Sequence, residues 1–215
     1  MDTVRWIRDR KIVAIVRNIP NDYILKLANA LYIGGIDIIE IAFNSDDPSN
    51  WINTATAIEI IAENMKGKML IGAGTVLNMK QLELAKNAGA KFIVSPNVNI
   101  KLIKKAKKFG LFVLPGALTP TEIEVAHEAG ANIIKLFPAG IMKPEYIKAV
   151  KAPFPHIGLI AVGGVNVKNA SDFITAGCCG IGLGGNLVNK DWIISGEFNK
   201  ITSLAQEYRK AVDNI

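Results

Sequence analysis

The chain has 215 residues, of which 50% are hydrophobic and 20% are charged, and its net charge is +6 at pH 7. This composition suits one domain with a large core, and we find no linker and no low-complexity segment. No apolar stretch approaches the roughly 18 to 20 residues that a membrane-spanning helix needs. We therefore expect a single domain over residues 1–215 and no membrane partner.

The first residues and the cysteines indicate the cellular setting. The chain starts with a charged helical segment and not with a signal peptide. Its only cysteines, Cys178 and Cys179, are adjacent, cannot easily bridge each other and lack metal-ligand spacing. We therefore expect a cytoplasmic protein in a reducing environment.

The densest run of positive charge covers residues 101–108, with the sequence KLIKKAKK. The net positive charge would fit attraction of an anionic substrate or of nucleic acid. The apolar residues of the run have helical spacing, which predicts that its lysines form the solvated outer face of a helix. Since no aromatic or glycine-rich nucleic-acid motif accompanies the run, we expect no nucleic-acid partner.

Taken in order, the chain alternates short apolar runs with amphipathic segments. A helical segment at 2–9 comes first and is predicted to cover the bottom of a barrel. The apolar runs predict eight strands, at 12–17, 37–43, 70–76, 92–96, 111–116, 132–138, 158–164 and 180–185. Helical patterns lie between and after them, at 21–33, 51–65, 78–88, 99–109, 120–129, 144–151, 166–176 and 198–213.

Local signals mark the ends of these helices. A turn with glycine, where the end of a helix needs positive φ, recurs at 33–35, 88–90, 129–131 and 176–178. Several polar residues and prolines are predicted at helix starts, namely Asn78, Thr119 or Thr121, and Asn166 as caps, with Pro120 and Pro144 in first turns.

Eight strands that are almost continuously apolar, each followed by a helix, need a parallel sheet that is covered on its outer face. Closed on itself, such a sheet is a (β/α)8 TIM barrel, and we expect this α/β fold with a short N-terminal helix. The alternative is an open doubly wound sheet. Against it, the residues Ile15 to Asn18 at the end of the first strand do not resemble a dinucleotide-binding loop.

Two charged residues interrupt these strands. Lys135 lies within the run 132–138 and Glu40 within the run 37–43, and each would be costly to bury without a partner. Alternation places Glu40 on one face of its strand with Ile38 and Ala42, and Lys135 on one face with Ile133 and Phe137. With these faces toward the barrel interior, the two charged side chains could meet. Burial lowers the pKa of an amine, a neutral amine attacks a ketone carbonyl, and a neighbouring carboxyl can move protons. The plain alternatives are a structural ion pair and a lysine whose ammonium reaches solvent.

Two pairs of glycines end the last two predicted strands, at Gly163-Gly164 and Gly184-Gly185. In many barrels the loops after these strands bind a phosphate through backbone N–H groups and a helix N-terminus. The alternative is that the glycines only allow tight turns. Each pair alone is weak support for a phosphate site, and the two in register are stronger.

At this point the sequence resembles the KHG/KDPG aldolases, the class I aldolases that form pyruvate from 2-keto-3-deoxy-6-phosphogluconate (KDPG) or from its galactonate epimer. The resemblance covers nearly the whole chain. It rests on the motifs IIEIAFNS, IGAGTVL, FIVSPN, PGALTPTEI, IIKLFPAG and AVGGV. Of these, the lysine-centred motif and GAGTV, in this order and spacing, are the specific ones.

The resemblance implies a role for each matching residue. Lys135 matches the lysine that forms a Schiff base with the substrate, and Glu40 matches the glutamate that moves protons. Arg17, Gly74 and Thr75 match positions that hold the pyruvate carboxylate. The family is also homotrimeric, so the resemblance implies a homotrimer.

The same resemblance assigns the remainder of the predicted site. Pro96 and Phe137 match the walls of the pocket, and three glycines match the phosphate site, namely Gly163, Gly164 and Gly184. Gly185 stands where a serine hydroxyl often contacts the phosphate, so its backbone alone would serve here. Val162 stands where the gluconate-type pattern has threonine, and with Asn44 it is more similar to the galactonate type.

The chemistry of the residues agrees with an aldolase. Breaking a C–C bond beside a 2-keto group creates a carbanion, and an iminium formed with a lysine accepts those electrons without a metal. The only histidines, His127 and His156, do not stand with a second ligand at metal spacing, and His127 is expected on the outer side of a helix. We therefore expect a lyase with a phosphorylated keto acid as substrate and neither a metal nor a cofactor.

Two other functions stay open from the residues alone. One is a phosphosugar isomerase or epimerase on the same barrel, with Glu40 as the base and Lys135 as an electrostatic helper. The other is a phosphosugar-binding or assembly protein without catalysis, which would leave the two buried charges unexplained. The sequence also leaves open the preferred epimer and the cleavage of unphosphorylated keto acids such as 4-hydroxy-2-oxoglutarate.

Overall fold

Parallel strands alternate with helices through residues 3–213, the part of the chain that this computed structural model describes. The strands are β1 (Ile12–Arg17), β2 (Ile38–Ala42), β3 (Leu70–Gly74), β4 (Phe92–Val94), β5 (Phe112–Leu114), β6 (Gly116–Ala117), β7 (Ile134–Leu136), β8 (Leu159–Val162) and β9 (Gly180–Leu183). Each of the eight predicted apolar runs contains one of these strands, and the fifth run contains β5 and the start of β6.

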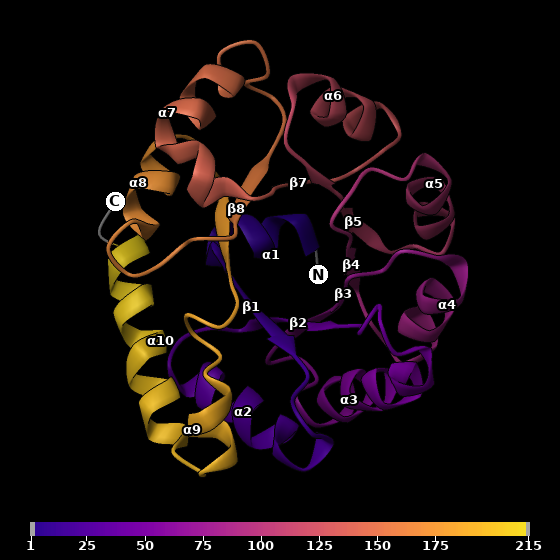
Figure 1. Ribbon diagram of the computed structural model, residues 1–215, viewed down its shortest axis with the longest axis vertical. Coiled ribbons are helices and arrows are strands. Elements are labelled where there is room, and N and C mark those ends of the chain that lie inside the picture. The colour runs from indigo at the N-terminus through magenta and orange to yellow at the C-terminus, as the bar shows by residue number, and fades with distance from the viewer. Residues whose placement is uncertain (1–2, 214–215) are drawn as a thin grey trace.

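Helices surround the ring of strands, as Figure 1 shows. They are α1 (Thr3–Arg10), α2 (Asn21–Ile33), α3 (Trp51–Asn64), α4 (Met79–Asn87), α5 (Ile100–Lys108), α6 (Pro120–Glu128), α7 (Ala139–Lys151), α8 (Ala170–Thr175), α9 (Lys190–Ile194) and α10 (Phe198–Asp213), with a 3-10 turn η1 at Pro48–Asn50. The short α9 and η1 were not predicted from the sequence.

The sheet closes through the fifth predicted strand. The strand order runs from β5 through β4, β3, β2, β1, β9, β8 and β7 to β6, so β5 and β6 lie at the two ends of the order. These two strands are consecutive in the chain and are separated only by Pro115. The backbone N–H of Lys135 in β7 donates to the carbonyl oxygen of Pro115 at 2.9 Å. The (β/α)8 prediction is therefore confirmed, and the open doubly wound sheet is wrong.

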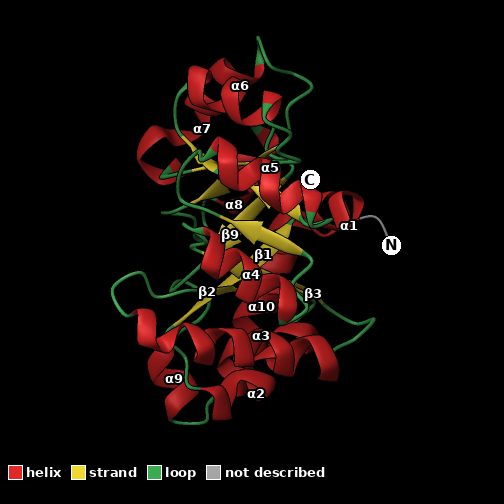
Figure 2. Ribbon diagram, turned by 90° about the vertical axis from the view of Figure 1, so that its right-hand side faces the viewer, coloured by secondary structure: helices red, strands yellow, loops and turns green. Residues whose placement is uncertain are grey.

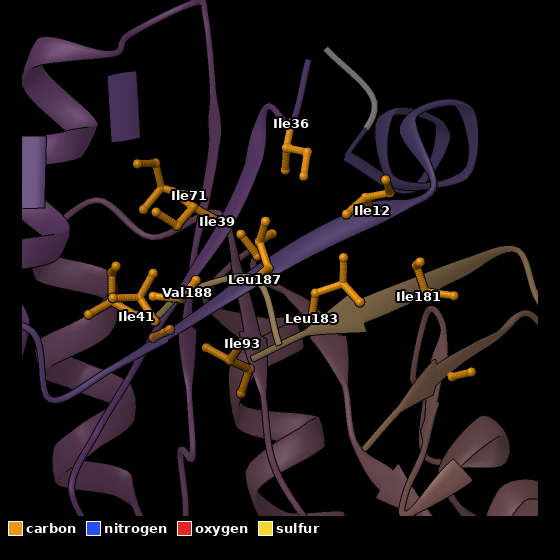
Figure 3. Close-up of a cluster of buried hydrophobic side chains, with 14 of the residues drawn as sticks. Ile12, Ile36, Ile39, Ile41, Ile71, Ile93, Ile181, Leu183, Leu187 and Val188 are labelled. Carbon is orange, nitrogen blue, oxygen red and sulfur yellow. The ribbon is translucent and has the colours of Figure 1, made fainter. Parts of the chain in front are cut away.

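The strand side chains divide between two apolar clusters, as the alternation predicts. The outer cluster lies between the strands and the helices, and Figure 3 shows members of it from β1, β2, β3, β4 and β9. The inner cluster fills the lower barrel and consists of Ile7, Val13, Ile38, Leu70, Phe92, Val94, Leu114, Ile133, Ile160 and Val162. Glu40 and Lys135 lie two residues beyond Ile38 and Ile133 of this cluster on the same faces of their strands, so the cluster forms the floor of the site.

Helix α1 closes the bottom of the barrel, as predicted. It lies over the centre of the ring in Figure 1 and at one side of the strands in Figure 2. Ile7 is fully buried in the inner cluster. Trp6 Nε1 donates to Asp37 Oδ2 at 3.0 Å, and Arg10 Nε forms an ion pair with the same oxygen at 3.0 Å. These contacts fasten the helix to the start of β2.

Most of the predicted helix ends are confirmed. Asn78 Oδ1 accepts from the N–H of Gln81, and Thr119 forms a capping box with Glu122, which decides between the two candidate threonines. Among the predicted turn glycines, Gly89 and Gly177 illustrate the positive φ, at 90° and 111°.

The predicted helix starts at Pro144 and Asn166 have different outcomes in the structure. Lys143, with φ 61° and ψ 166°, breaks α7, so Pro144 opens its second segment in agreement with the prediction. The prediction that Asn166 caps α8 is wrong, because the helix begins at Ala170 after Asn169. The side chain of Asn166 instead accepts from the N–H of Lys168 within a preceding turn.

Candidate active site

A cavity of about 550 Å³ opens at the C-terminal ends of the strands. Most of the predicted site residues line it, namely Arg17, Thr75, Pro96, Lys135, Phe137, Val162, Gly163, Gly164, Gly184 and Gly185. The predicted Glu40 and Gly74 are not in its wall. They lie on the strands β2 and β3, in positions described below.

Lys135 stands in the middle of β7 and is only 8% exposed. Its backbone is held between Gly116 of β6 and Ile160 of β8. Its side chain reaches the cavity wall, where Nζ lies 5.0 Å from the ring centroid of Phe137. Among the described residues it forms no salt bridge with Glu40. Neither a tight structural ion pair nor a lysine head in bulk solvent therefore accounts for it.

Glu40 is the other buried charge and is 2% exposed. Burial raises the pKa of its carboxyl, while the positive charges of Lys135 and Arg17 act in the opposite direction. The two cations are therefore close enough for their fields to act on this carboxyl, although neither forms a salt bridge with it. A carboxyl with a raised pKa between two cationic groups is suited to accept and return a proton.

Gly74 makes room for the Glu40 side chain. A Cβ atom at Gly74 would lie 1.8 Å from Glu40 Oε1 and 2.6 Å from Cδ, which no side chain tolerates. The space beside Gly72 on the same strand is occupied in the same way by the ring of Phe92, since a Cβ atom at Gly72 would lie 2.3 Å from that ring. The glycines of β3 thus leave space for side chains that cross the barrel.

Arg17 and Thr75 form the cationic side of the cavity. Arg17 Nη2 donates to Thr75 Oγ1 at 2.8 Å, and Nη1 donates to the carbonyl oxygen of Phe43 at 3.3 Å. Thr75 has φ 53°, which is rare for a β-branched residue and is a strained conformation. The guanidinium, held by β2 and β3, therefore meets the cavity in one orientation, as recognition of a carboxylate requires.

The two predicted glycine pairs line the same cavity. Gly163 and Gly164 have φ of 87° and 80°, and the N–H of Gly140 donates to the Gly163 carbonyl at 2.7 Å. Gly184 and Gly185 differ from them. A Cβ atom at either would meet nothing within 4 Å. Space beside their backbone is therefore left open, which is the condition for close approach of an anion.

Pro96, Phe137 and Val162 complete the wall, as predicted. Phe137 is 39% exposed, which is unusual for a large apolar ring, and a Cβ at Gly163 would lie 3.2 Å from it. An exposed ring beside a buried lysine limits the access of water to the amine while leaving one apolar surface for a ligand to contact.

The cavity wall also contains residues that the sequence interpretation did not select, namely Ile15, Ser45, Val165, Gly182 and Asn186. Ile15 could have been found, because it lies two residues before Arg17 on the same face of β1. Ser45 belongs to the motif IIEIAFNS, and Asn186 directly follows a predicted glycine pair. For Ser45 and Asn186 the position in the chain was a signal, but the sequence does not show in which direction a loop side chain points.

The arrangement is suited to a small molecule with two anionic ends and a carbonyl between them. The guanidinium of Arg17, the open glycine backbone and the amine of Lys135 all line this one cavity. Within residues 3–213, no three side chains of histidine, cysteine, aspartate or glutamate come together to hold a metal ion. The two histidines pack against each other on the surface, with ring centroids 5.3 Å apart.

Comparison with known proteins agrees with this geometry. A sequence model of the family described as "KDPG and KHG aldolase" matches residues 4–204. The 2-dehydro-3-deoxy-6-phosphogalactonate aldolase of Escherichia coli (strain K12) is 37% identical to the chain over 210 residues, which cover 97% of this chain and 100% of the relative.

Two solved structures are similar over most of the chain. One is the KDPG aldolase of Legionella pneumophila with pyruvate captured at low pH as a covalent carbinolamine intermediate, with a TM-score of 0.86 and 25% identity, covering 96% of this chain and 97% of that one. The other is a porous protein cage designed by fusing symmetric oligomeric domains, with a TM-score of 0.84 and 37% identity, covering 94% of this chain and 71% of that one.

Proposed function

The chain belongs to the KDPG and KHG aldolase family, and from this we propose that it cleaves a 2-keto-3-deoxy-6-phosphoaldonate to pyruvate and glyceraldehyde 3-phosphate. The observation that carries the proposal is the buried amine of Lys135, which faces the same cavity as the Arg17 guanidinium and lies within the field of the Glu40 carboxyl. An amine in such a place is the nucleophile of a Schiff-base aldolase.

The first steps assemble the iminium. Arg17 and Thr75 bind the substrate carboxylate, which brings the C2 carbonyl to Lys135. The neutral amine adds to C2 to give a carbinolamine. Glu40 donates a proton to the departing hydroxyl, and loss of water leaves an iminium whose positive charge is next to the bond to be broken.

The bond between C3 and C4 then breaks. Glu40, now a carboxylate, accepts the proton of the C4 hydroxyl while the bonding electrons move into the iminium to form an enamine. Glyceraldehyde 3-phosphate leaves as the aldehyde. Glu40 returns that proton to C3 of the enamine, and the resulting iminium is attacked at C2 by water, whose proton Glu40 accepts. Collapse of the carbinolamine then releases pyruvate and the free amine and leaves Glu40 protonated as at the start, so atoms and charges balance over the cycle.

The phosphate end of the substrate fits the four glycines of the β8 and β9 loops. The open space beside Gly184 and Gly185 supports this, because neither glycine needs to be small for packing. Among the described residues, the lysine and the arginine in the cavity wall are Lys135 and Arg17, which lie outside these two loops, and Lys168 near the end of the β8 loop is not part of the wall. Backbone N–H groups supply the binding in this proposal, as they do at other phosphate sites in barrels.

Val162 bears on which epimer is preferred. Its apolar side chain lines the cavity where the gluconate-type pattern has a hydroxyl-bearing threonine. The relative from Escherichia coli named for the galactonate epimer is 37% identical to the chain. We therefore expect faster cleavage of the galactonate epimer.

The test compares pyruvate release from both 6-phosphate epimers, from their unphosphorylated acids and from 4-hydroxy-2-oxoglutarate in one coupled assay. Borohydride is added in parallel to enzyme and pyruvate, because reduction of the iminium adds a stable mass to the protein. We expect this mass on wild type and not on Lys135→Ala. Isomerisation or epimerisation of a phosphosugar with neither pyruvate release nor trapping would instead favour the isomerase or epimerase, and binding without any turnover would favour the non-catalytic alternative.

The assembly of the protein is a separate proposal. The resemblance to the family implies a homotrimer, and the similar chain in a cage built from symmetric oligomeric domains supports an oligomer. Light scattering on a sizing column should then give about three times the chain mass of 23.2 kDa. The mass of a single chain would contradict this proposal.

The cellular location is proposed on the cysteines. Cys178 and Cys179 are free thiols, and burial raises the pKa of Cys178 to about 12, which keeps it protonated and unreactive. Unpaired cysteines suit a reducing compartment, so the cytoplasm is the expected location. Among residues 3–213, no helix combines the length and apolar character needed to cross a bilayer. Cell fractionation tests the proposal, and recovery outside the cytoplasmic fraction would contradict it.

A further inference from the structure

Asn186 joins the two glycine loops of the cavity. We define the β8 loop as residues 163–169 and the β9 loop as residues 184–189. Asn186 belongs to the β9 loop, and its Nδ2 donates a hydrogen bond to the carbonyl oxygen of Val165 in the β8 loop at 2.7 Å. The same side chain lines the cavity beside Gly185.

Each loop is otherwise held by bonds that do not reach the other loop. In the β9 loop, the N–H groups of Leu187 and Val188 both donate to the Gly184 carbonyl at 2.9 Å. In the β8 loop, Asn169 Nδ2 donates to the Gly164 carbonyl at 3.0 Å. In the part of the chain that the structure describes, the bond of Asn186 is the single hydrogen bond between the two loops.

The distance between the loops matters for an anion that both loops bind. The strands β8 and β9 pair as far as Val162 and Gly182, so the glycines lie beyond the last paired residues. Glycine backbone is conformationally permissive, and two such loops without a connection would move independently. A phosphate held by N–H groups from both sides needs these donors at hydrogen-bonding distance at the same time.

We propose that Asn186 is a positioning residue that fixes the β9 loop against the β8 loop, so that N–H groups of both loops converge on the phosphate of the substrate. This inference rests on the proposed function, because it needs a phosphate at the glycine end of the cavity. In this inference Asn186 acts only through the two loops. Binding of the substrate carboxylate by Arg17 and the reaction at the amine of Lys135 do not depend on Asn186.

The inference predicts a selective loss. Net loss of one intramolecular hydrogen bond, here a part-buried one, corresponds to about a three- to tenfold change in an equilibrium, so KM for the phosphorylated substrate should rise by about that factor in Asn186→Ala. Asn186→Leu keeps the volume without the donor and should behave similarly. Neither variant should slow cleavage of the unphosphorylated acid or borohydride trapping of pyruvate by more than about twofold.

The experiment measures kcat and KM for 2-keto-3-deoxy-6-phosphogalactonate and for its unphosphorylated acid. It uses wild type, both Asn186 variants and Asn29→Ala. Asn29 is a matched control, because its Nδ2 also donates to a backbone carbonyl, that of Leu25 at 2.9 Å, on the exposed face of α2. Pyruvate trapping on the same preparations reports whether the barrel and Lys135 are intact. We expect only the Asn186 variants to lose preference for the phosphorylated acid.

Three results would overturn the inference. If wild type prefers the phosphorylated acid and both Asn186 variants keep that preference, Asn186 does not position the loops, and the proposed function stands. An equal loss on both acids in the Asn186 variants, with impaired trapping, would show general damage to the barrel rim. A wild type without any preference for the phosphorylated acid would remove the phosphate site itself and the inference with it.

Discussion

Gly74 and Glu40 depend on each other, because the carboxyl occupies the volume where a side chain of residue 74 would begin. Gly74→Ala would place Cβ 1.8 Å from Glu40 Oε1, so the carboxyl must move away from the site. We expect the variant to fold and to lose most of its turnover, as a displaced acid–base group is typically worth about 10²- to 10⁴-fold. Pyruvate-release kinetics together with circular dichroism check this. Wild-type kinetics in a folded variant would contradict it.

Glu40→Gln tests the proton transfer without a change of shape. The amide cannot titrate, so kcat should fall by about 10²- to 10⁴-fold, while borohydride trapping of pyruvate should persist at a lower rate. Glu59→Gln, on the exposed face of α3, removes a carboxyl of the same kind far from the cavity and should leave kcat unchanged. A kcat within a few-fold of wild type in Glu40→Gln would mean that Glu40 is structural.

The raised pKa of Glu40 also makes a prediction about stability. The folded protein keeps the Glu40 proton to a higher pH than the unfolded chain does. This carboxyl therefore contributes stability below its unfolded pKa of about 4.3, and the contribution is lost as pH rises through the folded value. Glu40→Gln should gain stability relative to wild type between pH 4 and pH 8, as measured by urea unfolding. A difference that is constant with pH would contradict the shift.

At the scale of elements, the strands and helices could be predicted from periodicity and turn residues. The bounds of β1 and α2 agree with the prediction, because five consecutive apolar residues and a following amphipathic segment leave little ambiguity. The fifth strand could not be divided from the sequence. Pro115 has no N–H to donate and separates β5 from β6. β5 pairs with β4, whereas β6 pairs with β7. These pairings depend on how the barrel closes, which the sequence does not show.

The short elements α9 and η1 were missed for a related reason. Five or fewer helical residues show no full period of apolar positions, and their stability comes from neighbouring contacts. At α9, Asn189 Oδ1 accepts from the N–H of Trp192, a cap signal that resembles an ordinary loop until the helix is seen. Asn166 gave the opposite error, because an asparagine that opens a turn looks the same in sequence as one that caps a helix.

The capping box of α6 allows a matched comparison at this scale. Thr119 and Thr121 were equal candidates in the sequence, and the structure assigns the cap to Thr119. Thr119→Ala should lower the free energy of unfolding by about 1 kcal/mol, within a range of roughly 0.5 to 2. Thr121→Ala, at an exposed helical position, should change it by no more than about 0.5 kcal/mol. Equal effects in urea unfolding would contradict the assignment.

The candidate site was predictable to the extent that strands carry it. Lys135 follows from alternation along its strand, Arg17 follows from its place at the end of the first strand and from the family resemblance, and the glycine pairs follow from their place after β8 and β9. Gly74 shows the limit. Its contact with Glu40 is made across the β2–β3 pairing, and no local pattern reveals which side chain fills the space above a glycine. Asn186 shows the same limit for loops.

At the scale of the whole molecule, the apolar residues that stabilise the barrel interior lie apart from the charged residues of the candidate site. The inner apolar cluster and α1 fill the lower half, and the charged groups of the candidate site, Arg17, Glu40 and Lys135, lie above that cluster. The net charge of +6 is carried in part by exposed lysines of α5, which agrees with the predicted solvated face. Such a field attracts an anionic substrate over a distance that salt shortens, so it affects the rate of encounter and not the bond-breaking step.

The substitution Ile7→Ala tests whether the lower half of the barrel can lose stability without any change in catalysis in the upper half. Its side chain is fully buried under the barrel, at the end opposite to the cavity. Ile7→Ala removes three carbon atoms from a close-packed region that α1 cannot refill, so the free energy of unfolding should fall by about 2 to 5 kcal/mol. The exposed Ile33 is the matched control, and Ile33→Ala should cost no more than about 0.5 kcal/mol. Below the unfolding transition, kcat and KM of Ile7→Ala should equal those of wild type. A fall in kcat while the protein remains folded would show that the floor of the barrel also positions Lys135 and Glu40.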